Sequence, residues 1–246
     1  MMIYEAKKQI TYNDIDANWD VTLTAILKYM TEANWGNGEQ IEVGVNHMLE
    51  TGLAFVIQRI AIKILKLPIL GDEFTLRTWH ADTRRLTFTR KGEFLDKSGH
   101  KLIEWESLWV LFDVNDRRIK RPDVLNVPLS PYGSLGVSVE TEKILPVESE
   151  HLASFKHCVQ FSELDTYQHM SNTYYGNLLA NVYACNESRS TFMKAGTEIQ
   201  FNYINEGQLG DEVLVNLNQA DHHLYITGET NKHQVFAATI KQEVSR

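Results

Sequence analysis

The sequence is poor in several features whose absence excludes whole classes of protein. It has two cysteines in 246 residues, Cys158 and Cys185, which is too few for a disulfide framework and lacks the spacing of a metal-binding pair. Two thiols suit a reducing compartment, although one disulfide is left open. No apolar run reaches the roughly 18 residues of a transmembrane helix. The opening residues, MMIYEAKKQITY, lack the apolar stretch of a signal peptide, so we expect a cytoplasmic protein.

Positive charge is also scarce. Lysine and arginine number 24 against 32 aspartates and glutamates, which gives a net charge of −8 at pH 7. This balance argues against a general nucleic-acid binder, which would present a broad basic surface. Glycine-rich phosphate loops of the P-loop or dinucleotide-binding type are missing as well. The hydrophobic fraction of 43% still allows a substantial core, and the length fits one large domain or two ordinary ones.

The second half of the chain repeats the pattern of the first. A strand-like segment at 2–11 precedes an Asp- and Asn-rich turn, YNDIDANWD, and then an amphipathic helix. Asp20 or Thr22 is the expected cap of this helix, and Gly36 and Gly38 are expected to end it. Another strand-like segment, FKHCVQF, precedes a second turn and helix, and GDEV at 210–213 corresponds to GDEF at 71–74. These correspondences indicate an internal duplication with a period of about 140–150 residues.

The repeat divides the chain into two units. Residues 116–132 are dense in basic residues and proline and have no apolar period, so we place an N-terminal domain at 1–132, a linker at 133–152 and a C-terminal domain at 153–246. In each unit a helix is followed by antiparallel strands, and it can bury its apolar stripe only if the sheet wraps around it. The sequence therefore predicts an α+β protein with two such units.

One stretch, LDTYQHMSNTYYGNLLANVY at 164–183, combines reactive side chains with a helix. Asp165, Tyr167 and His169 alternate, and Ser171 or Asn172 can cap the helix that follows. The unpaired N–H groups at a helix N-terminus can stabilise a developing oxyanion. Taken alone, the same residues also fit a capped helix whose Asp and His satisfy local hydrogen bonds.

These features together resemble the acyl-[acyl carrier protein] thioesterases of plants and bacteria, which have a double (tandem) hotdog fold. The family motif D-x-N-x-H-x-x-N corresponds here to residues 165–172, and a second motif, Y-x-x-E-C, corresponds to residues 203–207. Two positions depart from the pattern, because Tyr167 replaces the motif's Asn and Gly207 replaces its Cys. A cysteine nucleophile is therefore missing at that position, and the resemblance favours attack by a water that a carboxylate activates.

The resemblance implies a catalytic set of five residues: Asp165, Tyr167, His169, Asn172 and Glu206. Glu206 is the first candidate for the base, with Asp165 as the alternative. Asp165 is expected to fix the imidazole tautomer of His169, and the backbone N–H groups after His169 are expected to hold the oxyanion. The resemblance implies no cofactor, and no third ligand at a recognisable spacing suggests a metal beside Asp165 and His169.

The first half lacks the Asp–His pattern, so it can serve as the wall of an acyl slot. Its expected lining is the strand at 55–66 together with helix residues Leu23, Ile26, Leu27 and Met30. An acidic carrier protein needs a local basic patch, and the candidate residues are Arg117, Arg118, Lys120 and Arg121, followed by Arg84-Arg85 and Arg90-Lys91.

The leading hypothesis is hydrolysis of fatty acyl-carrier thioesters to free fatty acids. The alternatives are a hotdog acyl-CoA thioesterase and a non-catalytic acyl-binding module. The expected partner is the acyl carrier protein, with no nucleic acid and no membrane insertion. The sequence leaves the acyl chain length and the oligomeric state open, with a homodimer as one option.

Overall fold

The computed structural model describes residues 3–127, 129–132, 135–187 and 191–242. The first half contains β1 (Tyr4–Gln9), α1 (Leu23–Gln40), α2 (Val45–Thr51), β2 (Leu53–Ile64), β3 (Glu73–Arg84), β4 (Thr87–Leu95), β5 (Lys101–Asp113) and β6 (Arg118–Lys120). The second half contains β7 (Glu150–Cys158), α3 (Tyr175–Asn186), β8 (Thr197–Tyr203), β9 (Glu212–Ala220), β10 (His223–Glu229) and β11 (Gln234–Gln242).

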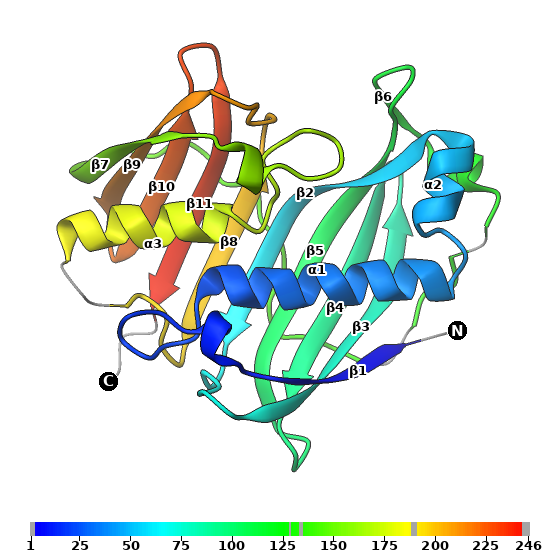
Figure 1. Cartoon of the computed structure of the whole chain (residues 1–246), viewed down its shortest axis with the longest axis horizontal. Helices are drawn as coiled ribbons and strands as arrows, with labels where there is room; N and C mark the ends of the chain where they lie inside the picture. The colour runs from blue at the N-terminus through cyan, green and yellow to red at the C-terminus, as the bar shows by residue number, and fades with distance from the viewer. Residues whose placement is uncertain (1–2, 128, 133–134, 188–190, 243–246) are drawn as a thin grey trace.

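The strands of both halves form one continuous antiparallel sheet. Their order is β1-β3-β4-β5-β2-β8-β11-β10-β9-β7, with β6 paired to β5. The halves join where β2 pairs with β8, and there Ile60 lies opposite Phe201 with both side chains buried. Figure 1 shows α1 and α3 on the same face of this sheet, one in front of each half. The predicted tandem hotdog architecture is confirmed, with the two sheets fused at their shared edge.

The start of α1 agrees with the prediction, but its end does not. The Thr22 hydroxyl accepts a hydrogen bond from the Ala25 N–H at 3.1 Å, so Thr22 caps the helix. Gly36 and Gly38 were expected to end the helix, yet it continues to Gln40. At Gly36 an added Cβ would lie 2.5 Å from the Tyr4 ring, so this glycine allows β1 to approach the helix.

The expected cap of α3 is wrong, because the chain makes an extra turn first. The helix begins at Tyr175, and the Ser171 hydroxyl instead shares a hydrogen bond of 3.1 Å with the hydroxyl of Thr173. A Cβ added at Gly176 would lie 2.8 Å from the Thr24 backbone nitrogen. The Thr24 hydroxyl also donates to Asn177 Oδ1 at 2.5 Å. The first turns of α1 and α3 therefore touch, which fixes one half against the other.

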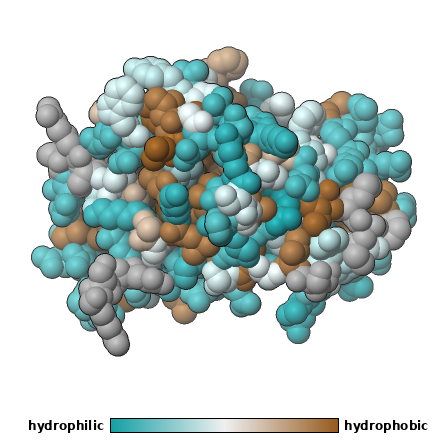
Figure 2. Space-filling view, turned by 90° about the horizontal axis from the view of Figure 1, so that it is seen from below, coloured by the Kyte–Doolittle hydropathy of each residue, from teal (hydrophilic) through white to brown (hydrophobic). Residues whose placement is uncertain are grey.

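The segment between the halves runs along the sheet and is held by polar side chains of the sheet strands. Glu104 of β5 accepts hydrogen bonds from the backbone and hydroxyl of Ser138, at 3.0 and 2.6 Å. Asn202 of β8 accepts from the Ile144 N–H at 3.0 Å. The following strand, β7, begins at Glu150, inside the range predicted as linker. Seen from below in Figure 2, apolar side chains gather toward the middle of a largely hydrophilic surface.

Candidate active site

The loop at 164–170 is closed by its own backbone and by Asp165. Leu164 and Met170 form a β-bridge, and the Asp165 N–H donates to the His169 carbonyl at 2.8 Å. Asp165 Oδ1 accepts hydrogen bonds from the N–H groups of Tyr167 and His169, at 2.8 and 3.3 Å. Asp165 was expected to hold the imidazole of His169. Its carboxylate instead accepts hydrogen bonds from backbone N–H groups of its own loop, because these groups lie within the same tight turn.

The acid that contacts the imidazole is Glu206. It lies just after β8, and its Oε2 is 2.9 Å from His169 Nε2. The side chains of His169 and Glu206 are 27% and 43% exposed, so the pair lies at the wall of an opening and not in the core. The same Oε2 lies 3.8 Å from Nη2 of Arg117, in the turn between β5 and β6. The His169–Glu206 pair of the second half thus has a cation of the first half beside it.

A cleft of about 510 Å³ opens beside this pair and is lined from both halves. The first half contributes apolar side chains of β2 and β5, including Phe55, Ile57 and Trp109. The second half contributes all five predicted catalytic residues, together with Met170, Tyr175, Tyr203, Ile204 and Asn205.

The helix residues expected to line the acyl slot lie elsewhere. Their exposed fractions are 3% or less, and they belong to the main hydrophobic core: Leu23, Ile26, Leu27 and Met30. They are buried because α1 presses its apolar stripe onto the sheet. The part of the predicted strand at 55–66 that does reach the cleft is its beginning, from Phe55 to Gln58.

The backbone N–H groups expected to hold an oxyanion are already in use. The Met170 N–H donates to the Gly207 carbonyl at 2.8 Å, and the Ser171 N–H donates to the Glu163 carbonyl at 2.9 Å. Asn172 lines the cleft, and its carbonyl accepts from the Tyr203 hydroxyl at 3.3 Å. The two N–H groups that follow His169 are therefore engaged within the loop, and the Asn172 side-chain amide, which also contacts the Tyr203 hydroxyl, is another donor candidate in the cleft.

The two departures from the family motif have different structural settings. The Tyr167 hydroxyl points to Met48 Sδ in α2, at 3.9 Å. Burial is the main cause that raises the pKa of this phenol, and the negative charge of Asp165 raises it further. At Gly207 an added Cβ would make an ordinary contact of 3.4 Å with Met170. Space for a side chain therefore exists there, and the missing thiol is a chemical difference and not a steric one. Cys158 and Cys185 are free and exposed.

The residues of the predicted basic patch have unequal surroundings. Lys120 pairs with Asp113 at 3.1 Å and with Asp116 at 2.5 Å, so its charge is largely compensated. Arg118 and Arg121 are exposed. Arg117 faces Glu206 and lines the cleft. No short-range pattern could indicate this contact, because residues 117 and 206 lie in different halves of the chain.

The reserve docking residues Arg90 and Lys91 point toward partners in the protein. Arg90 donates to the side-chain oxygens of Asn34 and Asn37 in α1, at 3.2 and 2.5 Å. Burial lowers the pKa of this guanidinium to about 10. Lys91 lies 3.4 Å from Glu106. A docking role for this pair is not compatible with these contacts.

Comparison with known proteins identifies the family of the chain. Residues 2–126 match the family described as "Acyl-ACP thioesterase N-terminal domain". The chain belongs to the acyl-ACP thioesterase family. No curated protein sequence gives a significant match.

Solved structures of this family share the fold over nearly the whole length. An acyl-ACP thioesterase from Bacteroides thetaiotaomicron superposes with a TM-score of 0.83 at 16% identity, covering 97% of each chain. The 12:0-ACP thioesterase from Umbellularia californica gives 0.80 at 17% identity, over 97% of this chain and 96% of that one. A putative oleoyl thioesterase from Lactobacillus plantarum gives 0.77 at 18%, over 97% and 95%.

Within the described residues, no group of three or more His, Cys, Asp or Glu side chains is arranged to hold a metal ion. None of the helices in that part of the chain has the length and apolar character needed to cross a membrane.

Proposed function

We propose that this protein hydrolyses fatty acyl thioesters of acyl carrier protein, releasing the free fatty acid and the carrier. The observation that carries the proposal is the 2.9 Å contact between His169 Nε2 and Glu206 Oε2 at the wall of the cleft. A thioester is already activated toward attack, so a base, an oxyanion donor and a sheltered site are sufficient to accelerate its hydrolysis.

In the proposed reaction, Glu206 removes a proton from a water molecule as the water oxygen bonds to the acyl carbon. His169 stays hydrogen-bonded to Glu206 and orients it, while the Asn172 amide donates to the carbonyl oxygen as that oxygen gains negative charge. Collapse of the tetrahedral intermediate breaks the C–S bond, and the Glu206 carboxyl returns the proton to the leaving thiolate. Asp165 supports the reaction indirectly, by holding the loop that carries His169.

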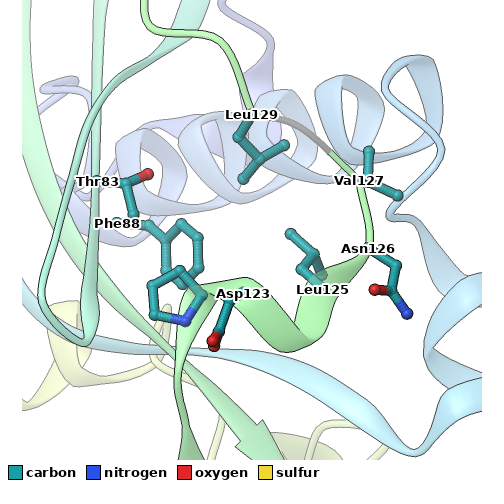
Figure 3. Close-up of a pocket in the computed structure, with 8 residues that line it drawn as sticks. Thr83, Phe88, Asp123, Leu125, Asn126, Val127 and Leu129 are labelled. Atoms are coloured by element: carbon teal, nitrogen blue, oxygen red, sulfur yellow. The ribbon is translucent and has the colours of Figure 1, made fainter.

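The acyl chain would extend from this pair into the N-terminal half. Phe55, Ile57 and Trp109 supply an apolar wall, and the Phe55 ring packs edge-on against Phe88 at 5.1 Å. A second cavity of about 380 Å³ lies beyond Phe88, and Figure 3 shows Phe88, Leu125 and Leu129 facing one another across it. Displacement of the Phe55–Phe88 contact would let a longer chain reach this space.

The acidic carrier would dock beside the turn between β5 and β6. Arg118 and Arg121 are exposed there, and neighbouring Arg117 reaches the mouth of the cleft. Such a patch on a protein of net charge −8 would steer an acidic partner at a rate that falls with salt. Acyl-CoA is the second candidate substrate, since its phosphates are anionic too.

The test is a hydrolysis panel in which the same acyl groups, over a range of chain lengths, are presented on carrier protein and on CoA. We expect turnover of a fatty acyl group, with a higher kcat/KM on the carrier. A higher kcat/KM on CoA would favour the acyl-CoA thioesterase. Binding of acyl thioesters with no turnover on either carrier would identify an acyl-binding module and overturn the proposal.

A further inference from the structure

Both contacts of the Glu206 carboxylate fall on a single oxygen. Oε2 lies 2.9 Å from His169 Nε2 and 3.8 Å from Arg117 Nη2. The described residues make no such contact with Oε1, so this oxygen is available to a water in the cleft. The 2.9 Å contact with His169 restricts rotation of the carboxylate about its last bond, and the Arg117 charge favours the same orientation because it attracts the same oxygen.

Arg117 comes from a turn whose backbone is well fixed. Asp113 Oδ1 accepts hydrogen bonds from the N–H groups of Asn115 and Asp116, at 2.9 and 3.0 Å. Lys120 closes the turn from the other side through ion pairs to Asp113 and Asp116. These contacts fix the backbone from which Arg117 reaches Glu206, while the Arg117 side chain itself is 74% exposed.

Arg118 is the neighbouring residue and provides a natural comparison. It is exposed and starts β6, where it lies opposite Asp113 in the strand pairing. It is not among the described residues that line the cleft. The two adjacent arginines thus carry the same charge but differ in whether they reach Glu206.

We infer that Arg117 is a positioning residue for the reaction: it holds the Glu206 carboxylate from the N-terminal half, so that the two halves share one site. The inference rests on the proposed thioesterase function. It departs from a pure docking role, in which Arg117 would act only on the carrier and would leave the chemistry unchanged. Because a surface ion pair is weak in isolation, the effect should appear in turnover and not in global stability.

The experiment uses the full-length protein and a neutral substrate without carrier or phosphate, the octanoyl thioester of N-acetylcysteamine. Arg117→Gln should lower kcat about tenfold, the effect of roughly 1.4 kcal/mol of lost transition-state stabilisation, with KM changed by less than about twofold. Arg117→Lys should recover most of the loss. Arg118→Gln should match the wild-type protein on this substrate.

An unchanged kcat in Arg117→Gln would overturn the inference. A rise in KM confined to substrates linked to carrier or CoA would also overturn it, because Arg117 would then be a docking residue. If the wild-type protein hydrolysed no thioester, the proposed function would fail, and a second readout would still decide. In protein with ¹⁵N-labelled histidine, Arg117→Gln should shift the His169 Nε2 resonance and Arg118→Gln should not. A resonance unmoved by Arg117→Gln would contradict the inference.

Discussion

The two halves of the molecule build the same loop with different side chains at its functional positions. In the first half, Asp16 Oδ1 accepts hydrogen bonds from the backbone N–H groups two and four residues further on, at 2.7 and 3.1 Å. In the second half, Asp165 Oδ1 makes the same two contacts at 2.8 and 3.3 Å. The contacts of Asp165 are therefore scaffolding common to both copies, and the aspartate alone does not mark the catalytic one.

The loops that lie against these segments correspond as well. The Gly71 N–H donates to the Ile10 carbonyl at 2.9 Å, and the Gly210 N–H donates to the Val159 carbonyl at 3.0 Å. His169 lies four residues after Asp165, and the residue four after Asp16 is Asp20. Glu206 lies four residues before Gly210, and the residue four before Gly71 is Leu67. One scaffold thus carries an imidazole and a carboxylate in one copy and lacks that pair in the other.

The largest effect is expected where the copies differ in chemistry. His169→Ala should lower acyl-thioester hydrolysis about a hundredfold, because it removes the side chain that orients the proposed base Glu206, and misplacing a catalytic group by about 1 Å can cost that much. Asp20→Ala changes the corresponding position of the first copy and should leave kcat near wild type. Steady-state kinetics on both variants, with circular dichroism to confirm folding, checks this. Equal losses in the two variants would mean that both copies take part in the chemistry.

An intermediate effect is expected where the copies agree. Asp165→Ala removes the acceptor of two backbone N–H groups and should cost about 1–2 kcal/mol of unfolding free energy. Displacement of His169 should also lower kcat about tenfold or more. Asp16→Ala should cost a similar unfolding free energy but leave kcat unchanged. Urea unfolding and kinetics on the pair would show whether Asp165 has only this scaffolding role. A kcat loss as large as that of His169→Ala, with stability intact, would make Asp165 a candidate base.

A smaller effect is expected from the exposed arginines Arg118 and Arg121, which follow the turn between β5 and β6. Replacing Arg118 and Arg121 together by Glu should raise KM for an acyl-carrier substrate several-fold, because like charges would repel the acidic partner. The same double variant should hydrolyse a carrier-free thioester normally. The difference should shrink at high salt. If KM for the carrier substrate did not change, the docking surface would lie elsewhere, with Arg84 and Arg85 as the next residues to reverse.

No effect on turnover is expected from the thiols. Cys158→Ser and Cys185→Ser, singly or together, should retain activity, since both thiols are exposed and neither lines the cleft. Gly207→Ala should also be tolerated, because a Cβ there meets only ordinary contacts. Inactivation by a thiol-alkylating reagent that disappears in the double cysteine variant would contradict this account.

Much of the fold could be predicted because it depends on local patterns. The strand at β2 and the Thr22 cap follow from periodicity and turn chemistry within a few residues, and the duplication follows because such local patterns recur in the second half. The end of α1 was missed because Gly36 serves a contact with Tyr4, which lies far away in the sequence. Propensity alone cannot distinguish a glycine that ends a helix from one that makes room for a neighbour.

The site was only partly predictable, for a related reason. The chemistry of His169 and Glu206 could be proposed from a motif, but the acceptors of the Met170 and Ser171 N–H groups are carbonyls that only the folded loop brings close. The contact of Arg117 with Glu206 spans the two halves. Both depend on how the halves meet at β2 and β8, and no short-range pattern encodes that arrangement.

The most direct test of the account is the rate of acyl-carrier thioester hydrolysis by Glu206→Gln under single-turnover conditions. The amide has nearly the same shape and can still accept a hydrogen bond from His169, but it cannot take a proton from water. We expect the rate to fall at least about a hundredfold while the fold and the binding of the acyl thioester are retained. A rate close to wild type would show that Glu206 is not the base and would contradict the central claim.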